Sequence, residues 1–400
     1  MKYFNSIWIF ILSCTSINTV FASDNVESIE HSSQRELFTY VHPLEDTSKG
    51  MRRLYKLSST MEWFIVYFPV PYGSYSKETD FLFGLTKYNA FTMRRGNKQD
   101  SITQPSSVSG LGYYTLNSQY KMVVESNLML NKNKAIWKTS LINTSYPLLF
   151  YGIGNETDLN NERTLNSSNF QISMQYLFRI WRKWYLGPAY DYYYYYDVDL
   201  AEGSRPLPGD EVLLRNNLGH QSGLGLKLSM EGRDNRLNAK KGFFVDASYQ
   251  IFDQAIGSHF NYKFFQMDVR YYTTPFKKIT IATQLRVQSK QGEVPVQSLC
   301  LLGGDYSMRG AYLGRYRDKI LMDSQVEVRF PLFWIIGGTI FGGAGQVAPK
   351  YQEINLGSFH GIYGAGLRLK VDSKHDINLR VDMGFSKDQQ IFIMNFAEAF

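Results

Sequence analysis

The chain has 400 residues, of which 44% are hydrophobic, 16% aromatic and 20% charged, and its formal net charge is +7. The aromatic content excludes an intrinsically disordered chain, and two cysteines are too few for a small domain held together by disulfides. The chain is too polar on average for a bundle of membrane helices, which need about 18 or more consecutive apolar residues each. Its basic residues form no run that would indicate a nucleic-acid partner.

Residues 1–22 resemble a secretory signal peptide. A lysine gives the positive start, residues 7–12 form a short apolar core, and Ala22 stands at the −1 position of the predicted cleavage site. The sequence before Cys14 also resembles a lipoprotein processing site, which would make that cysteine a lipidated first residue, although its leucine fits the pattern poorly. We therefore favour cleavage near Ala22.

Residues 23–60 are polar and mixed, and we expect a loose N-terminal periplasmic arm there. This segment is too short for an independent domain without disulfides or metals. Cleavage at Ala22 leaves Cys300 as the single cysteine, so we expect no internal disulfide. We interpret Cys300 as a small packing residue rather than a nucleophile.

From residue 61 to the end, the dominant period of the sequence is two. In residues 378–385, four apolar residues alternate with Asn, Arg, Asp and Gly. Successive residues of a strand point to opposite faces, so such a segment has one oily and one polar face. The same alternation runs through residues 224–229, 279–288, 325–330 and 367–372.

Alternation alone also fits a soluble β-sandwich, but two features favour a transmembrane barrel. Full charges stand at strand centres on the polar faces, as a wet lumen requires, and rings gather near strand ends, as in the tyrosine run 192–196. A closed barrel also pairs every backbone group, which lipid demands. We therefore predict an all-β fold, a transmembrane antiparallel β-barrel over residues 61–400.

An even number of strands is typical of bacterial barrels, and the sequence accommodates sixteen. If both chain ends are periplasmic, the long connections 147–169, 198–218, 291–318 and 348–359 all fall on outer positions. The predicted strands are 62–70, 79–93, 107–118, 119–130, 135–146, 170–181, 184–197, 219–231, 242–254, 259–273, 278–290, 319–331, 335–347, 360–372, 376–386 and 390–400.

Four segments, taken in order, resemble the barrel domain of the BamA/TamA outer-membrane protein superfamily, also called the bacterial surface antigen family. Two of them are residues 150–155 and the last strands, from Tyr363 to Phe400. The loop motif consists of Gly303, Gly304, Arg309, Gly310 and Tyr312. The periplasmic turn motif consists of Arg233, Asp234, Asn235 and Gly242.

This resemblance implies a sixteen-stranded barrel whose sixth outer loop folds into the lumen, where Arg309 pairs with acids on the inner wall. Glu327, on the polar face of the next strand, matches one such acid. The second acid of the family is expected at position 343, where this chain has Gly343. A confined arginine needs a carboxylate partner; the alternative is a solvated loop arginine.

The terminal segment carries a further prediction. Phe392, Met394, Phe396 and Phe400 are expected to share one strand face, and Phe396 and Phe400 resemble the signal that the barrel assembly machinery reads during biogenesis. An ordinary lipid-facing strand would show the same pattern. The two interpretations are compatible.

We therefore expect an outer-membrane barrel that acts in the assembly or translocation of polypeptide or lipid, in contact with outer-membrane lipid and possible client proteins. Residues 23–60 are too short for a POTRA domain, so we expect a member without one. A passive pore is the alternative. No nucleophile elbow, phosphate-binding loop or metal-spaced histidine pair is present, so we predict no catalytic residue, metal or cofactor.

Overall fold

The computed structural model describes residues 60, 63–64, 67–76, 80–92, 103–116, 119–200, 218–372 and 376–400. The predicted signal peptide 1–22, with Cys14, lies outside the described residues, as does the predicted arm 23–60 apart from Thr60. The chain divides into two units, Met1–Trp63 and Phe64–Phe400, and all the strands belong to the second. Among the described residues, no helix has the length and apolar character needed to cross a membrane.

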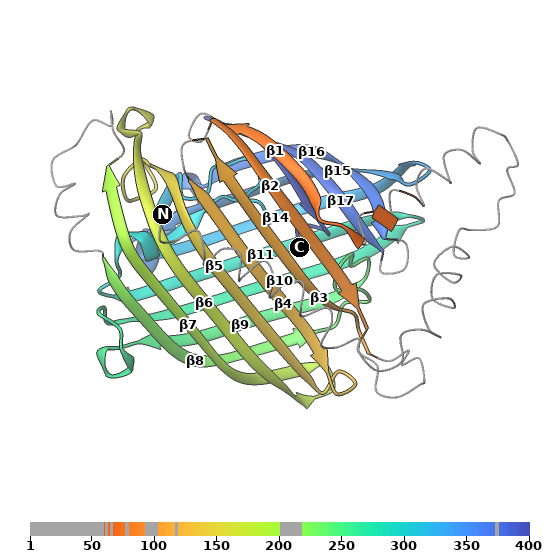
Figure 1. The fold of residues 1–400 in the computed structure, drawn as a ribbon, viewed down its shortest axis with the longest axis horizontal. Coiled ribbons are helices and arrows are strands. Elements are labelled where there is room, and N and C mark those ends of the chain that lie inside the picture. The colour runs from red at the N-terminus through yellow and green to blue at the C-terminus, as the bar shows by residue number, and fades with distance from the viewer. Residues whose placement is uncertain are drawn as a thin grey trace, which may run out of the picture. The chain divides into compact units, whose positions relative to one another are not determined.

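Sixteen strands form one antiparallel sheet in chain order, and the sheet curls into a barrel of tilted strands (Figure 1). The predicted all-β fold with sixteen strands is thus confirmed. The sheet strands are β1 Val70–Ser76, β2 Asp80–Phe91, β3 Ser106–Thr115, β4 Tyr120–Leu130, β5 Ala135–Phe150, β6 Arg163–Trp181, β7 Trp184–Leu200, β8 Gly219–Glu231, β9 Gly242–Phe252, β10 Tyr262–Phe276, β11 Ile279–Gly292, β14 Ile320–Phe333, β15 Ile336–Ala348, β16 His360–Asp372, β17 Ile377–Ser386 and β18 Gln390–Phe396.

The remaining elements lie in the connections. Two short strands, β12 (Cys300–Leu302) and β13 (Tyr316–Asp318), pair with each other between β11 and β14. The short 3-10 helices are η1 Leu159–Asn161, η2 Gln254–Ile256, η3 Val296–Ser298, η4 Tyr351–Glu353 and η5 Leu356–Ser358. These short helices lie at the end of the barrel that carries the long connections, which we call the long-loop end. We call the opposite end the short-turn end.

The prediction of a first strand at 62–70 is wrong. The Phe68 amide donates to the Phe64 carbonyl at 2.8 Å, which is a helical turn, and the two rings stack with centroids 5.3 Å apart. Strand β1 begins only at Val70. The other predicted ranges overlap their strands, and the largest shift at a strand start is in β6, which begins at Arg163 rather than at residue 170.

The wall of the barrel is polar inside and apolar outside. On β8, Leu226 is exposed whereas its neighbour Lys227 is buried, and Lys227 pairs with Asp246 of β9 at 2.6 Å. On β16, Leu367 is exposed and Arg368 is buried. A water-soluble protein buries its apolar side chains, so this inverse arrangement is the one expected for a wall that faces lipid.

The first and last strands meet at the short-turn end. Val70 of β1 packs against the buried cluster that contains Phe396 of β18, and the ring of Tyr88 on β2 stacks on Phe396 at 6.3 Å. The seam of the barrel is therefore bridged by apolar side chains at this end.

Candidate functional site

The connection between β11 and β14, here called the inward loop (residues 293–319), folds back against the inside of the barrel wall. Cys300, Leu302 and Met308 are buried in one apolar cluster with Phe341 of β15. The loop thus carries its own packed core, and the tip that follows it is held in a fixed position.

Arg309 lies at this tip. Its Nη1 donates to Asp382 Oδ2 at 2.7 Å, and its Nη2 donates to Glu327 Oε2. The ring of Phe341 lies 4.0 Å from the guanidinium carbon, a cation–π contact. Arg309 and both acids are 0% exposed, so the charge of this loop arginine is compensated by protein groups alone. A solvated loop arginine does not fit this environment.

Position 343 does not supply the second acid, and another strand does so instead. Gly343 pairs with Gln325, and a Cβ at position 343 would lie 2.7 Å from the carbonyl oxygen of Ser324, so a larger side chain has no room there. Asp382 of β17 supplies the second carboxylate instead. It stands on the charged face of the alternating segment 378–385, which is the signal that would have identified it.

The contact belongs to a larger buried group, here called the arginine–acid cluster. Its members are Arg309, Arg329, Arg368, Arg380, Glu327, Asp382 and Glu398, and all are buried. Asp382 contacts three of the arginines: besides Arg309, it accepts from Arg368 at 2.5 Å and from Arg380 at 3.0 Å. Glu327 also accepts from Arg329 Nε at 2.5 Å. Sequence reasoning identified only Arg309 and Glu327 of this cluster.

Glycines on neighbouring strands make room for the cluster. Phe341, Gly364 and Gly384 form one row across β15, β16 and β17. A Cβ at Gly364 would overlap the Phe341 ring, and a Cβ at Gly384 would overlap the carbonyl oxygen of Arg309. Gly310 of the loop motif faces the same strand, where its Cβ would lie 2.5 Å from the Phe385 carbonyl oxygen. The loop backbone therefore lies directly on the backbone of β17.

The other glycines of the loop motif shape the turn itself. Gly303 and Gly304 have φ values of +105° and +115°, which side-chain-bearing residues rarely adopt. Tyr312 holds the far side of the tip, because its amide donates to Gln389 Oε1 at 2.8 Å and its hydroxyl accepts from the Leu149 amide at 3.2 Å.

The segment 150–155 docks on the base of the inward loop. Arg315 lies over the Tyr151 ring at 4.4 Å, and Arg317 lies over the Phe150 ring at 4.9 Å. The Gly154 amide donates to the Arg317 carbonyl at 2.9 Å. Two motifs far apart in the sequence therefore meet at the long-loop end.

The predicted periplasmic turn motif forms a self-contained turn. The Asp234 carboxylate accepts from the amides of Asn235, Lys240 and Lys241 at 2.9, 3.0 and 3.2 Å. Arg233 forms two bonds to Glu231, of 2.8 and 2.7 Å. The remaining residue of the motif, Gly242, has a φ of +116°, and a Cβ there would overlap the Gly232 carbonyl.

This turn reaches the chain end on the opposite wall. The Glu398 amide donates to the Leu237 carbonyl at 3.3 Å, and Lys240 pairs with Asp376 at 2.6 Å. Arg329 connects the two segments, because it donates to the Ala239 carbonyl at 3.1 Å and to the Phe400 carbonyl at 2.9 Å. The arginine–acid cluster thus joins the inward loop, the turn and the chain end.

The prediction that the four terminal apolar residues share one strand face is wrong. Strand β18 ends at Phe396, Ala397 has a φ of +62°, and the chain then turns inward. Phe392 is 60% exposed, whereas Phe400 is 4% exposed and packs with Ala239 and Tyr272. Phe400 is therefore part of the lumen packing, and a role of Phe396 and Phe400 as an assembly signal stays a prediction.

Cys300 lies in the core of the inward loop, and its chemistry reports on that loop. The side chain is 1% exposed, and burial raises the pKa of the thiol to about 11 from a usual value of 9.0. The thiolate is the nucleophilic form, so a pKa higher by about two units lowers the thiolate fraction about 100-fold near pH 8.

We expect Cys300 to react with a maleimide at least about 100-fold more slowly in the folded protein than in urea at pH 8. The measurement is mass spectrometry of time-quenched samples in a Cys14→Ser background, with Cys300→Ser as the blank. Labelling of the folded protein at the urea rate would mean that the inward loop is not seated.

Within the part of the chain that the structure describes, no group of three or more His, Cys, Asp or Glu side chains is placed to hold a metal ion. The arrangement instead supports ionic fixation of a loop. Its acids are occupied by arginines rather than directed at an open cavity.

Comparison with known proteins agrees with this geometry. The sequence profile of the Omp85 superfamily domain matches residues 82–392. The chain belongs to the Omp85 superfamily. Members of this superfamily are outer-membrane barrels of bacteria, which function in assembly or transport rather than as enzymes. No curated protein matches the chain.

One solved structure shows the same fold at low sequence identity, and two further structures match with lower scores. CdiB from Escherichia coli is 8% identical, with a TM-score of 0.51 over 89% of this chain and 70% of the CdiB chain. A BamA from Haemophilus ducreyi lacking POTRA domains 1–3 is 14% identical, with a TM-score of 0.47 over 82% of this chain and 68% of the BamA chain. CdiB from Acinetobacter baumannii is 12% identical, with a TM-score of 0.49 over 81% of this chain and 58% of its own.

Proposed function

We propose that this Omp85 barrel acts in the assembly or translocation of polypeptides at the outer membrane, with the inward loop closing its lumen at rest. The observation that carries the proposal is the buried contact of Arg309 with Glu327 and Asp382. A passive channel needs an open wet path, whereas this loop is fixed across the lumen by fully buried ion pairs.

Two further features support handling of a client chain. The arginine–acid cluster is reached from both ends of the lumen, since the turn 232–241 and the chain end contact it from the short-turn end. The seam between β1 and β18 is bridged at that end by the side chains of Val70, Tyr88 and Phe396. A seam held at this end by side-chain packing suits the admission of a client strand, and a lipid would use the same route.

Liposome insertion is the direct test. The purified full chain, reconstituted in liposomes, should raise the yield of folded client barrel, read as protease-resistant and heat-modifiable product, above that of empty liposomes. Arg309→Met should change this yield, and the exposed-residue variant Arg182→Met should not. Equal yields with and without the protein would contradict the proposal.

Planar-bilayer conductance separates the proposal from the passive pore. We expect the wild-type barrel to be mostly closed, because the inward loop, the turn and the chain end all meet at the arginine–acid cluster in the lumen. Arg309→Met should increase the open time or the conductance severalfold, since it removes both buried ion pairs of the loop tip. A large steady conductance in the wild type would favour the passive pore instead.

A further inference from the structure

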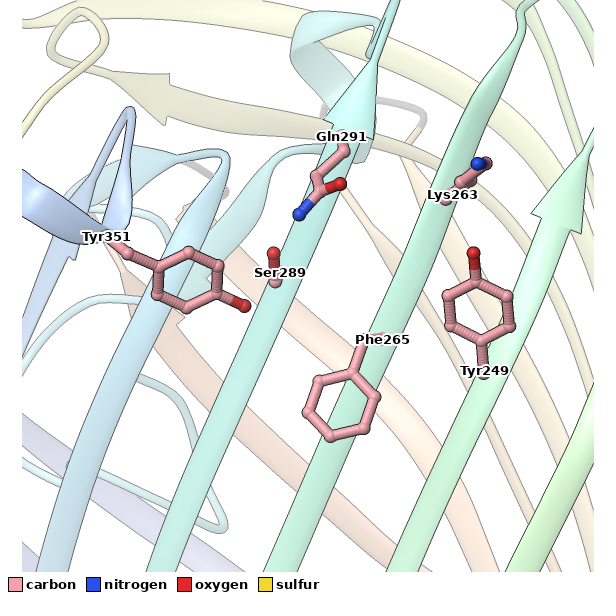
Figure 2. A pocket seen from close by; sticks show the side chains of 6 residues that line it. All are labelled: Tyr249, Lys263, Phe265, Ser289, Gln291 and Tyr351. Atoms are coloured by element: carbon pink, nitrogen blue, oxygen red, sulfur yellow. The ribbon is translucent and has the colours of Figure 1, made fainter.

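A small cavity lies on the outer wall of the barrel, at the long-loop end. Strands β9, β10 and β11 and the connection after β15 supply its lining residues, Tyr249, Lys263, Phe265, Ser289, Gln291 and Tyr351. In Figure 2 the polar ends of Ser289, Gln291 and Tyr351 lie on one side of the cavity and those of Lys263 and Tyr249 on the other, with the Phe265 ring below and between them. The cavity measures about 240 Å³, roughly eight times the volume of one water in the liquid.

The lining residues belong to the lipid-facing side of the wall. Tyr249, Phe265 and Ser289 stand in one row of the sheet, and Lys263 and Gln291 stand in the next row toward the loops. Tyr249 is 46% exposed, as expected for the outward face. These positions are therefore at the height where aromatic and basic side chains of a barrel meet lipid headgroups.

Two polar groups of this cavity lack partners. The Ser289 side chain is 2% exposed, and its hydroxyl has no hydrogen-bond partner. Among the described residues, Lys263 has no carboxylate within salt-bridge distance, and no acid lines the cavity; the acid nearest in sequence, Asp268, pairs with Arg270. A buried hydroxyl without a protein partner is free to bond to a ligand or a water.

The chemistry of the lining selects the ligand. A lysine ammonium is a point charge that binds phosphate, and the Ser289 hydroxyl and the Gln291 amide can donate to phosphate oxygens. Below them, the outward face of β10 continues with Phe265, Met267 and Val269, which offer an apolar track for acyl chains. A free anion would contact the polar side chains alone, whereas a lipid would contact the polar side chains with its headgroup and the apolar track with its acyl chains.

We propose that this cavity binds the phosphate headgroup of a membrane lipid, with its acyl chains along β10. The site is separate from the inward loop, and the proposal rests on the membrane location of the family rather than on the proposed handling of clients. The volume fits a phosphate with part of its headgroup, which a single ion would not fill.

The test is native mass spectrometry of the full chain in mild detergent with added phosphatidylglycerol. Wild-type protein should retain one lipid more tightly than the rest, and Lys263→Gln should weaken its retention about tenfold. Ser289→Ala should weaken it severalfold without removing any charge. Lys387→Gln, which removes an exposed lysine from the β17–β18 hairpin at the same end of the barrel, should bind as the wild type does.

Two comparison ligands identify the source of the phosphate. Diacylglycerol has the chains without the phosphate and should bind at least tenfold more weakly, and inorganic phosphate should not compete at millimolar concentration. Equal retention by wild type and Lys263→Gln, equal binding of diacylglycerol, or full competition by inorganic phosphate would each overturn the proposal. Client insertion by Lys263→Gln should equal that of the wild type, which separates this test from that of the proposed function.

Discussion

Asp382→Asn should lower the free energy of unfolding by about 3–5 kcal/mol, and by more than the loss of the loop arginine does. Asp382 contacts Arg309, Arg368 and Arg380, and its neutralisation removes a carboxylate from each. Arg309 keeps Glu327 and Arg368 keeps Glu398, but Arg380 has no other carboxylate partner among the described residues. In Arg309→Met, by contrast, both acids keep other arginines: Glu327 retains Arg329, and Asp382 retains Arg368 and Arg380. Removing the acid is therefore the more costly change.

Urea unfolding of the full chain in detergent or liposomes, followed by heat-modifiable gel migration, measures this order. Exposed charges provide the controls: Asp199→Asn and Arg182→Met should each stay within about 0.5 kcal/mol of the wild type. A smaller loss for Asp382→Asn than for Arg309→Met would mean that the cluster is not short of negative charge. Maleimide labelling of Cys300 should nevertheless rise more in Arg309→Met than in Asp382→Asn. Only Arg309→Met removes both ion pairs between the loop tip and the barrel wall.

The strands could be predicted because a barrel wall separates two solvents. Each strand has lipid on one side and a wet lumen on the other, so the period of two persists in nearly every strand, and β8 and β16 have the predicted bounds. The exception at 62–70 has a physical cause. Phe64 and Phe68 are four residues apart, which is one helical turn, and a ring pattern of that spacing fits a helix as well as a strand end.

The site could be predicted only in part, because the contacts depend on register. The motif containing Arg309 identified the loop, and alternation placed Glu327 in the lumen. Which second acid reaches Arg309 depends on the alignment of β15, β16 and β17, which puts Asp382 opposite Gly366 and leaves Gly343 beside Gln325. A single sequence does not contain that alignment.

The chain end and the outer cavity were missed for a similar reason. The alternation of 390–396 gave no signal that Ala397 adopts a left-handed backbone and turns Phe400 inward. The cavity around Lys263 takes its lining from three strands and a distant connection, so its parts are separated by many residues in the sequence. The residue pattern of one segment predicts a strand or a helix. A site built from several segments can be predicted only when the pairing of the strands is known.

Gly384→Ala should release the inward loop although it leaves every charge in place. A Cβ at position 384 would overlap the Arg309 carbonyl oxygen and lie 2.9 Å from the Cα of Gly310, and both are backbone atoms that no rotamer change can move away. Overpacking of this kind costs about 1–3 kcal/mol. The loop is held by side-chain contacts, whereas the β17 backbone is held by hydrogen bonds to both neighbouring strands. We therefore expect the loop, rather than β17, to move. We expect lower stability and faster maleimide labelling of Cys300.

Gly361→Ala provides the matched control on the adjacent strand β16. A Cβ at position 361 meets no atom within 4 Å, and its φ lies outside the left-handed region, so alanine should be neutral or should stabilise by about 0.4–1 kcal/mol. The two variants add the same methyl group to neighbouring strands, at position 384 on the inner face that the inward loop covers and at position 361 on the outward face. Equal Cys300 labelling in both would show that the loop does not rest on β17. Faster labelling in Gly384→Ala alone would locate the contact at that strand, because neither change touches an ion pair.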